Sequence, residues 1–405
     1  MMKKNPISRE YSLGNFIPQV VAGNSTWIQY FLSYFNYGYL TFCTPFRFRL
    51  DPETNAYVLQ TNRVQKIVSG VLNFCSLICI WTSFRKMQDV DFQKNPLLYI
   101  ELASVTLDSV YLCWVLVMFW ARSHHFLQLF EELQSSILLQ FFTGAVKRTK
   151  YFSMGLCAMS FVQAVISVVY EIERDDWSQD HLWEEMFKQA KYMFMLGPEA
   201  TSEGAVAAIL IVIFVVLKFF NILLKNFADL IGLMSVILLR QVVNDLLSAM
   251  KQDNFTPSLL QGCYDALKDL MEKLNAAVGI FIFFIFLGPV PYYSINIVDM
   301  LDAPDHLLLT SNCIYLLTYF VTLILAARIN KKGFKIKHWL EQQERYEKIP
   351  HPKLIMILHD ISSDEIGLSG QGYFTATSGL VGTVIIFAVI THCPHNISPL
   401  KFTTV

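Results

Sequence analysis

Polar side chains recur inside long apolar stretches of this chain, at positions where they could bind a small molecule. Glu101 and Asp108 lie seven residues apart in one stretch, so they share a helix face. Gln163 and Tyr170 lie in a later stretch. Because polar side chains inside a membrane are costly without a use, we predict that these four residues contribute to ligand binding.

Five further candidates extend the same kind of surface, and they are Tyr292, Tyr293, Asn296, Asn312 and Tyr315. The first three follow Gly288–Pro291, a segment expected to kink its helix. Aromatic walls with a few hydrogen-bonding groups are typical of small-molecule pockets. The carboxylates would favour a hydroxyl-rich or cationic ligand over a purely apolar one. The alternative for each residue is a hydrogen bond between helices, worth about 0.6 kcal/mol.

The composition places these residues in a membrane. Hydrophobic residues make up 54% of the 405, charged residues 16%, and the mean hydropathy is +0.39. A soluble chain of this length needs more charge to cover its surface, so we predict an all-α integral membrane protein. The formal net charge of −1 argues against a nucleic-acid partner. Residues 1–19 are polar, so no cleavable signal peptide is expected.

Seven apolar runs approach or exceed the roughly 20 helical residues that cross a bilayer. They are Ile67–Phe84, Pro96–Trp120, Tyr151–Tyr170, Ala205–Leu224, Ala276–Val298, Leu307–Ala327 and Ser378–Cys393. An eighth stretch, Trp27–Phe46, is rich in Tyr and Phe and is broken by Gly38 and Pro45. We expect it to lie in the cytosolic interface, where amphipathic rings are favoured. If it spans instead, the count becomes eight.

The end of the chain indicates its orientation. The glycosylation triplet that begins at Asn396 follows the last apolar run, which predicts an extracellular C-terminus and, with seven spans, a cytosolic N-terminus. Residues 1–66 are then a cytosolic segment with an interfacial helix, and 67–405 form the seven-helix domain. The segments that this polarity places inside hold 24 Lys or Arg, and those outside hold 7. This asymmetry follows the positive-inside rule.

Two spans are expected to continue as a cytosolic hairpin over about 228–275. After the fourth apolar run, Leu239, Val243, Leu246 and Met250 keep a helical spacing, and a second helical pattern runs over Leu260–Val278. Pro257 suits the first turn of the second helix. The pattern therefore predicts one helix from Ala205 to Met250. The hairpin either packs within one chain or forms an anchoring layer through which several copies associate.

These features resemble the insect gustatory receptors of the insect chemoreceptor superfamily. Three local matches carry the resemblance. Gly38–Phe46 is close to the family's Gly-Leu-x-Pro-Phe stretch. Leu239–Asn244 matches the segment that closes the family's fourth span, and Leu368–Thr375 matches the segment that leads into its last span. The resemblance implies a tetrameric ligand-gated cation channel in the plasma membrane of sensory neurons. Its expected partners are a small-molecule tastant, membrane lipid, and copies of itself or of related receptors.

In this family the last span lines a central pore, and the resemblance implies a pore helix over about 377–393. The family's hallmark is Thr-Tyr, five apolar residues and then Gln-Phe, and it is degenerate here. In the preferred register Ile386-Phe387 stand for Thr-Tyr and Cys393 for Gln, whereas a gapless register puts Thr391-His392 on Thr-Tyr. Thr383, Ile386, Ile390 and Cys393 are then spaced by 3, 4 and 3 and share one face. A ring of Ile390 side chains could close the pore by dewetting. The alternative is a stripe that only packs on neighbouring helices.

Other classes of protein find less support. The sequence carries no metalloprotease, nucleophile-elbow or phosphate-loop motif, so we predict no enzyme activity, no cofactor and no metal site. A G-protein-coupled receptor would carry Asp-Arg-Tyr after its third span and Asn-Pro-x-x-Tyr in its last, and both are missing. A transporter would show an internal repeat or paired Gly-broken spans, and none is visible. These two classes remain the alternatives.

Overall fold

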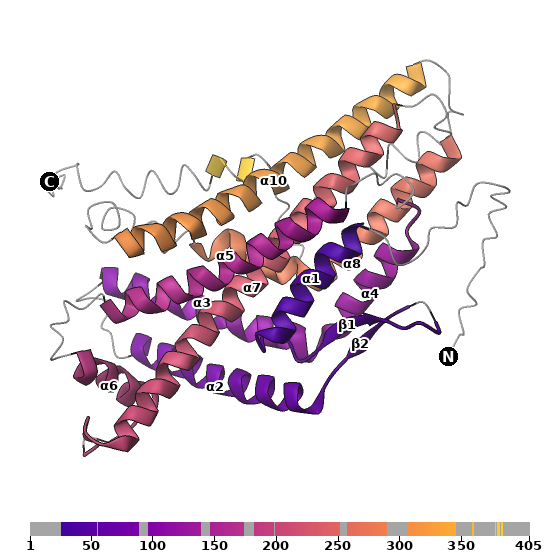
Figure 1. The fold of residues 1–405 in the computed structure, drawn as a ribbon. Coiled ribbons are helices and arrows are strands. Elements are labelled where there is room, and N and C mark those ends of the chain that lie inside the picture. The colour runs from indigo at the N-terminus through magenta and orange to yellow at the C-terminus, as the bar shows by residue number, and fades with distance from the viewer. Residues whose placement is uncertain are drawn as a thin grey trace, which may run out of the picture.

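Long helices running in broadly the same direction dominate the computed structural model, with a two-stranded hairpin at one side (Figure 1). The structure describes residues 26–54, 56–88, 96–138, 146–173, 182–197, 199–251, 257–289 and 306–345, together with 359, 377, 379–380 and 382–383. The elements are α1 (Thr26–Leu40), β1 (Arg47–Leu50), β2 (Tyr57–Gln60), α2 (Arg63–Gln88), α3 (Pro96–Trp120), α4 (Ser123–Ser135), α5 (Val146–Glu173), α6 (Leu182–Met193), α7 (Ala205–Ala249), α8 (Pro257–Leu287) and α10 (His306–Arg345).

Five of the seven apolar runs lie within helices, namely α2, α3, α5, α7 and α10, and a sixth, Ala276–Val298, lies on α8 as far as Leu287. The part of that run beyond Pro289 lies outside the described residues. Five helices in the described part are long and apolar enough to cross a membrane. A sixth span would come from α3 and α4, which form an apolar pair bent by 63°. The predicted helical membrane protein is therefore confirmed. Most of the last run, Ser378–Cys393, lies outside the described residues, so the seven-span count and the orientation stay predictions.

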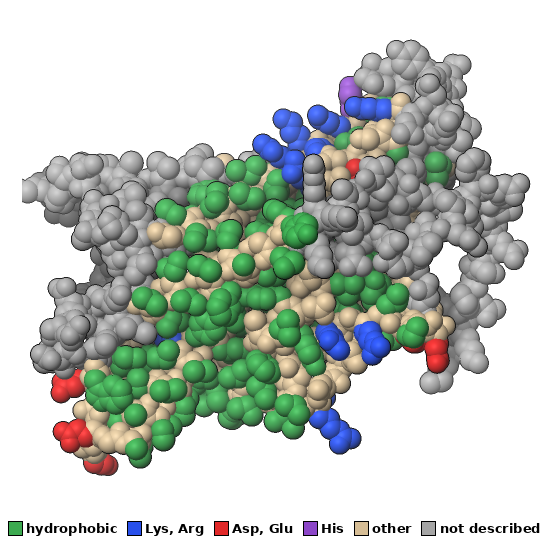
Figure 2. All heavy atoms as spheres, in the orientation of Figure 1, with side chains coloured by type: hydrophobic (Ala, Val, Ile, Leu, Met, Phe, Trp, Pro, Cys, Tyr) green, Lys and Arg blue, Asp and Glu red, His purple; other side chains and the backbone are tan. Residues whose placement is uncertain are grey.

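The surface carries the marks of a membrane protein (Figure 2). Green apolar side chains cover its middle, while acidic side chains gather at the end that bears α6 and basic ones at the other end, over α10 and near the β-hairpin. Large apolar side chains are exposed on several helices, for example Phe74, Trp81, Val206 and Val212. Such exposure would be costly in water and is favourable against lipid tails.

The 45 residues of α7 make it the central element of the bundle. At 1.5 Å per residue this helix is about 68 Å long, twice what a bilayer core requires. From Asn226 to Val236 every side chain is buried, because α1, α3, α5, α8 and α10 all pack around this stretch. The helix ends one residue before the predicted Met250, and α8 begins at Pro257 as its position in the first turn requires.

The N-terminal helix α1 has 15 residues, too few to cross a membrane. One face of α1 is buried: the ring of Phe35 meets Phe48 at 4.8 Å, Phe126 at 5.2 Å and Phe227 at 6.4 Å between centroids. Cys43, which follows α1 by three residues, is buried as well. Burial raises the pKa of its thiol to about 12, so this cysteine stays protonated at neutral pH. The helix α1 is thus held by its packing against α4, α5 and α7, in addition to any contact with the membrane interface.

The hairpin of β1 and β2 is a feature that an all-helical prediction missed. The two strands are antiparallel, with Arg47 opposite Gln60 and Leu50 opposite Tyr57. Phe48 and Tyr57 are its buried side chains, and both rings pack against Phe130 of α4 at 4.0 and 5.5 Å. The hairpin therefore links the end of α1 to α4.

Candidate ligand-binding site

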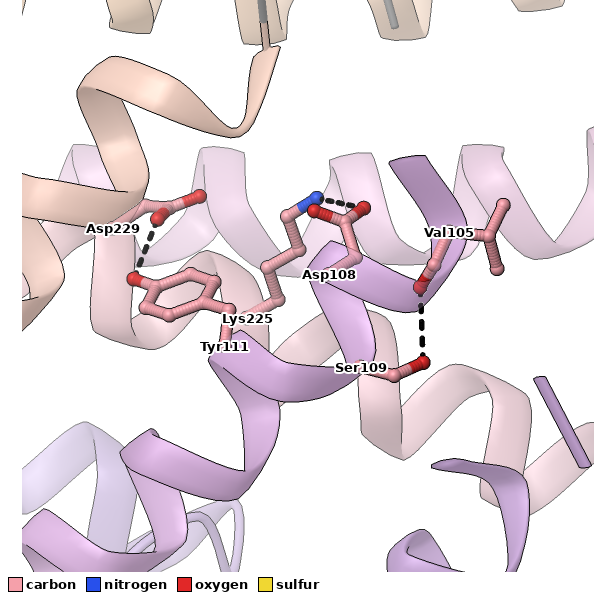
Figure 3. A network of polar contacts seen from close by, with 6 residues as sticks. All are labelled: Val105, Asp108, Ser109, Tyr111, Lys225 and Asp229. Atoms are coloured by element: carbon pink, nitrogen blue, oxygen red, sulfur yellow. Dashed lines mark hydrogen bonds and ion pairs between the residues drawn. The ribbon is translucent and has the colours of Figure 1, made fainter. Parts of the chain in front are cut away.

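An ion pair inside the bundle joins α3 to α7. Lys225 Nζ lies 2.6 Å from Asp108 Oδ2 (Figure 3). Asp108 lies near the middle of the 25-residue α3, so Lys225 is deep in the bundle rather than in a cytosolic segment that begins after Leu224. The helix α7 has 45 residues, α6 packs against it, and Lys225 lies twenty residues beyond its first residue, Ala205.

A second polar contact lies one turn further along the same two helices. Tyr111 donates its hydroxyl to Asp229 Oδ1 at 2.8 Å (Figure 3). Asp108 and Tyr111 are three residues apart on α3, while Lys225 and Asp229 are four apart on α7, so each pair shares a helix face. The Tyr111 ring stacks on Phe284 of α8 with 5.0 Å between centroids, which fixes the direction of its hydroxyl.

The helix α10 adds an aromatic group to this cluster. Lys225 Nζ lies 5.1 Å from the ring centroid of Tyr315, within the range of a cation–π contact. One cation thus meets a carboxylate from α3 and a ring from α10. Two carboxylates, Asp108 and Asp229, accompany this single lysine, so the cluster is richer in hydrogen-bond acceptors than in cations.

A cavity of about 20 Å³ adjoins the cluster, between α5, α7 and α10. Its lining residues are Leu156, Met159, Ser160, Gln163, Asn226, Asp229, Leu230, Ile314, Tyr315 and Thr318. The side chains of Gln163, Asn226 and Asp229 are almost fully buried, and Asn226 Nδ2 donates to the carbonyl oxygen of Ser160 at 3.3 Å. This space suits about one water molecule. It is a polar site that offers carboxylate, amide and hydroxyl groups together.

Comparisons with known proteins bear on the fold. No family model matches the sequence, and no curated protein matches it. Among solved structures, the insect olfactory receptor OR5 from Machilis hrabei superposes with a TM-score of 0.55 over 88% of this chain and 96% of that one, at 12% identity. The fold is that of an insect olfactory receptor. The structure of OR5 in complex with eugenol gives a TM-score of 0.52 over 90% and 97% of the two chains, at 12% identity.

This olfactory-receptor fold brings three of the predicted ligand-binding residues to one place. Asp108 and Tyr315 both contact Lys225, and Gln163 lines the same cavity as Tyr315. Glu101, Tyr170 and Asn312 lie in α3, α5 and α10, but their side chains are outside the described part. Tyr292, Tyr293 and Asn296 lie outside the described residues.

The predicted pore residues lie at the end of the chain. Thr383 is exposed and its Oγ1 donates to the carbonyl oxygen of Gly379 at 3.0 Å, a bond within one helical turn. Ile386, Ile390, Cys393 and the glycosylation site Asn396 lie outside the described residues. Their roles stay predictions.

Sequence reasoning missed four central residues of the cluster: Tyr111, Lys225, Asn226 and Asp229. A signal for them existed, because Lys225 and Asp229 are charged residues four apart in an apolar helix and must share a face. Spacing alone could not show which helix they meet, since Asp108 and Lys225 are 117 positions apart and no local pattern relates them. Only the packing of α7 against α3, α5 and α10 decided which side chains Lys225 meets.

Proposed function

We propose that this chain is a subunit of a chemoreceptor that forms a ligand-gated, non-selective cation channel in the plasma membrane of sensory neurons. The fold shared with OR5, which has been seen in complex with eugenol, supports a receptor for small molecules. The motif resemblance to gustatory receptors supports a tastant as the ligand. The same resemblance supports assembly as a homotetramer, or as a heterotetramer with related receptors.

The observation that carries the proposal is the polar cavity between α5, α7 and α10. Gln163, Asn226 and Asp229 present hydrogen-bonding groups inside an otherwise apolar bundle, an arrangement that selects hydroxyl-bearing or cationic ligands. With a volume of about 20 Å³ the cavity must enlarge to accept a tastant, which requires the three helices to separate. Ligand binding would therefore favour a rearranged bundle, and this differential affinity is what a gating mechanism needs.

The pore is assigned to the segment 377–393 of four copies around a common axis. Thr383, Ile386, Ile390 and Cys393 would face the ion path, with Ile390 as the apolar constriction. Rearrangement of α10 and α7 around the ligand would reach this segment through Leu380, which packs against the hydrophobic core. The channel then opens without a G protein.

The test is to record whole-cell currents from cells that express the chain alone, during application of sugars and bitter compounds. We expect a ligand-evoked cation current that persists when G-protein signalling is blocked. Gln163→Ala should raise the half-maximal ligand concentration about fivefold, since it removes a hydrogen bond worth about 1 kcal/mol. Val162→Ala is the matched control, because the adjacent Val162 on α5 is 51% exposed and lies outside the cavity.

Two results would contradict the proposal. Substrate uptake without any evoked current would indicate a transporter. Equal sensitivity of the Gln163→Ala and Val162→Ala receptors to every active ligand would exclude the cavity as the binding site.

A further inference from the structure

One face of α10 changes abruptly from apolar to cationic. Leu317, Val321 and Ile324 are exposed by 61%, 37% and 42% and follow each other at spacings of four and three. The same spacing continues the face with Arg328, Lys331 and Lys335, which are all exposed. Figure 2 shows basic side chains gathered over the upper part of α10. Such a change along one helix face is expected where lipid tails give way to headgroups.

The helix α7 contributes a further cation, Arg240, beside this face of α10. Lys332 of α10 donates to Asn244 Oδ1 of α7, which fixes its ammonium group at the seam between the two helices. The charged groups that act on Lys332 in the described part of the chain are Arg240, Arg328 and Lys335. Arg240 belongs to α7, so the cluster is built from both helices rather than from one.

These cations lack an acidic partner within the described residues. Every charge that acts on Lys332 there is another cation. Arg240 Nε is buried and has no acceptor in the described structure. On α7, Asp245 accepts instead from Gln241 Nε2 at 3.0 Å. Repulsion among clustered cations is unfavourable, and an anion with several acceptor oxygens would relieve it while pairing with the guanidinium groups.

We propose that this cationic cluster, made of Arg240, Arg328, Lys331, Lys332 and Lys335, binds the phosphate-bearing headgroup of an anionic membrane lipid. The apolar face of Leu317, Val321 and Ile324 on the same helix would hold the acyl chains, which is why a lipid fits better than a soluble phosphate compound. Exposed Phe334, 58% accessible between the cations, would enter the interface as an anchor. The site lies on the helix that also contributes Tyr315 to the ligand cavity, so bound lipid would bear on the position of α10.

The test measures binding of dioctanoyl phosphatidylinositol bisphosphate to the purified full-length protein in detergent. Dioctanoyl phosphatidylcholine and inositol trisphosphate serve as the neutral lipid and the soluble headgroup. We expect saturable binding of the anionic lipid, weaker binding of the headgroup alone and none of the neutral lipid. The double variant Arg328→Gln with Lys335→Gln should weaken binding about 30-fold, because the loss of each cation lowers the affinity about five- to sixfold. Both side chains are exposed, so the variant should fold.

The matched control is Arg63→Gln with Lys66→Gln, which removes two exposed cations at the start of α2 and changes net charge equally. Its affinity for the anionic lipid should equal that of the unaltered protein. Equal weakening by both double variants would overturn the proposal, because it would show attraction to overall charge rather than to a site. Binding of inositol trisphosphate as tight as that of the lipid would overturn the assignment to a lipid in favour of a soluble phosphate compound.

Discussion

The polar cluster depends on Lys225, because within the described part of the chain it is the cation that lies among Asp108, Asp229 and the Tyr315 ring. The Lys225 side chain is 21% exposed and the Asp108 side chain 44%, so the ion pair is not sealed inside the bundle. In a medium without water, each charge is stabilised mainly by the other. The pair is therefore a structural link between α3 and α7, and Lys225 contacts the proposed ligand site through Tyr315, which lines the cavity.

We expect Asp108→Asn and Lys225→Met each to lower the thermal unfolding midpoint, since either change leaves one charge without its partner. The double variant should lie closer to the unaltered protein than the sum of the two losses, because no lone charge remains. The measurement is the melting of detergent-solubilised protein, followed by size-exclusion fluorescence. Strictly additive losses would show that the two side chains do not interact.

Among the elements, α1 depends on a close approach to α7. Gly38 makes this approach possible, because a methyl group in its place would overlap the Phe227 ring, with Cε1 and Cε2 only 2.8 Å away. Phe227 is fully buried between Phe35, Tyr37 and Phe119 and has little room to move. A glycine in a helix is otherwise unfavourable, so its presence here is explained by packing.

Gly38→Ala should destabilise the protein by about 1–3 kcal/mol through overpacking. Gly155→Ala is the matched control: Gly155 lies in α5, and a methyl group there would meet no atom within 4 Å. That substitution should be neutral or stabilising, since alanine favours the helix by up to about 1 kcal/mol. Thermal melting and the yield of monodisperse protein measure both effects. Equal behaviour of the two variants would mean that α1 does not pack on α7 as described.

The whole molecule has two ends of opposite charge, with acidic residues near α6 and basic residues over α10 and around the β-hairpin (Figure 2). A membrane protein with this asymmetry places its basic end in the cytosol. The lipid site proposed on α10 then faces the inner leaflet, where anionic lipids are concentrated. The orientation that we predict for the chain, with its N-terminus inside and its C-terminus outside, agrees with this placement and stays a prediction.

Glycan should therefore attach at Asn396 and not at Asn24. Asn396→Gln should abolish the mobility change that glycosidase causes, and Asn24→Gln should leave it unaltered. A protease added outside intact cells should remove an epitope fused after Val405. Protection of that epitope, or glycan on Asn24, would reverse the orientation and remove the basis for the channel proposal.

The sequence by itself determined that this protein is a bundle of membrane helices and located most of them, although α10 continues to Arg345, 18 residues beyond the run Leu307–Ala327 that predicted it. Composition suffices for this because a bilayer leaves the backbone one way to satisfy its hydrogen bonds within a single segment. Even the 45-residue α7 and the start of α8 at Pro257 followed from helical spacing and proline chemistry. The nine polar candidates rest on their cost in an apolar setting, and their role in ligand binding stays a prediction.

The tertiary structure alone decided which polar groups meet. A helix of about 68 Å can slide through a bilayer core of about 30 Å without changing its composition, so sequence could not fix the depth of Lys225. Packing of α3, α5 and α10 around α7 fixed it and paired Lys225 with Asp108 across 117 residues. The β-hairpin and the burial of α1 likewise arose from aromatic contacts between distant segments, which periodicity within one segment cannot reveal.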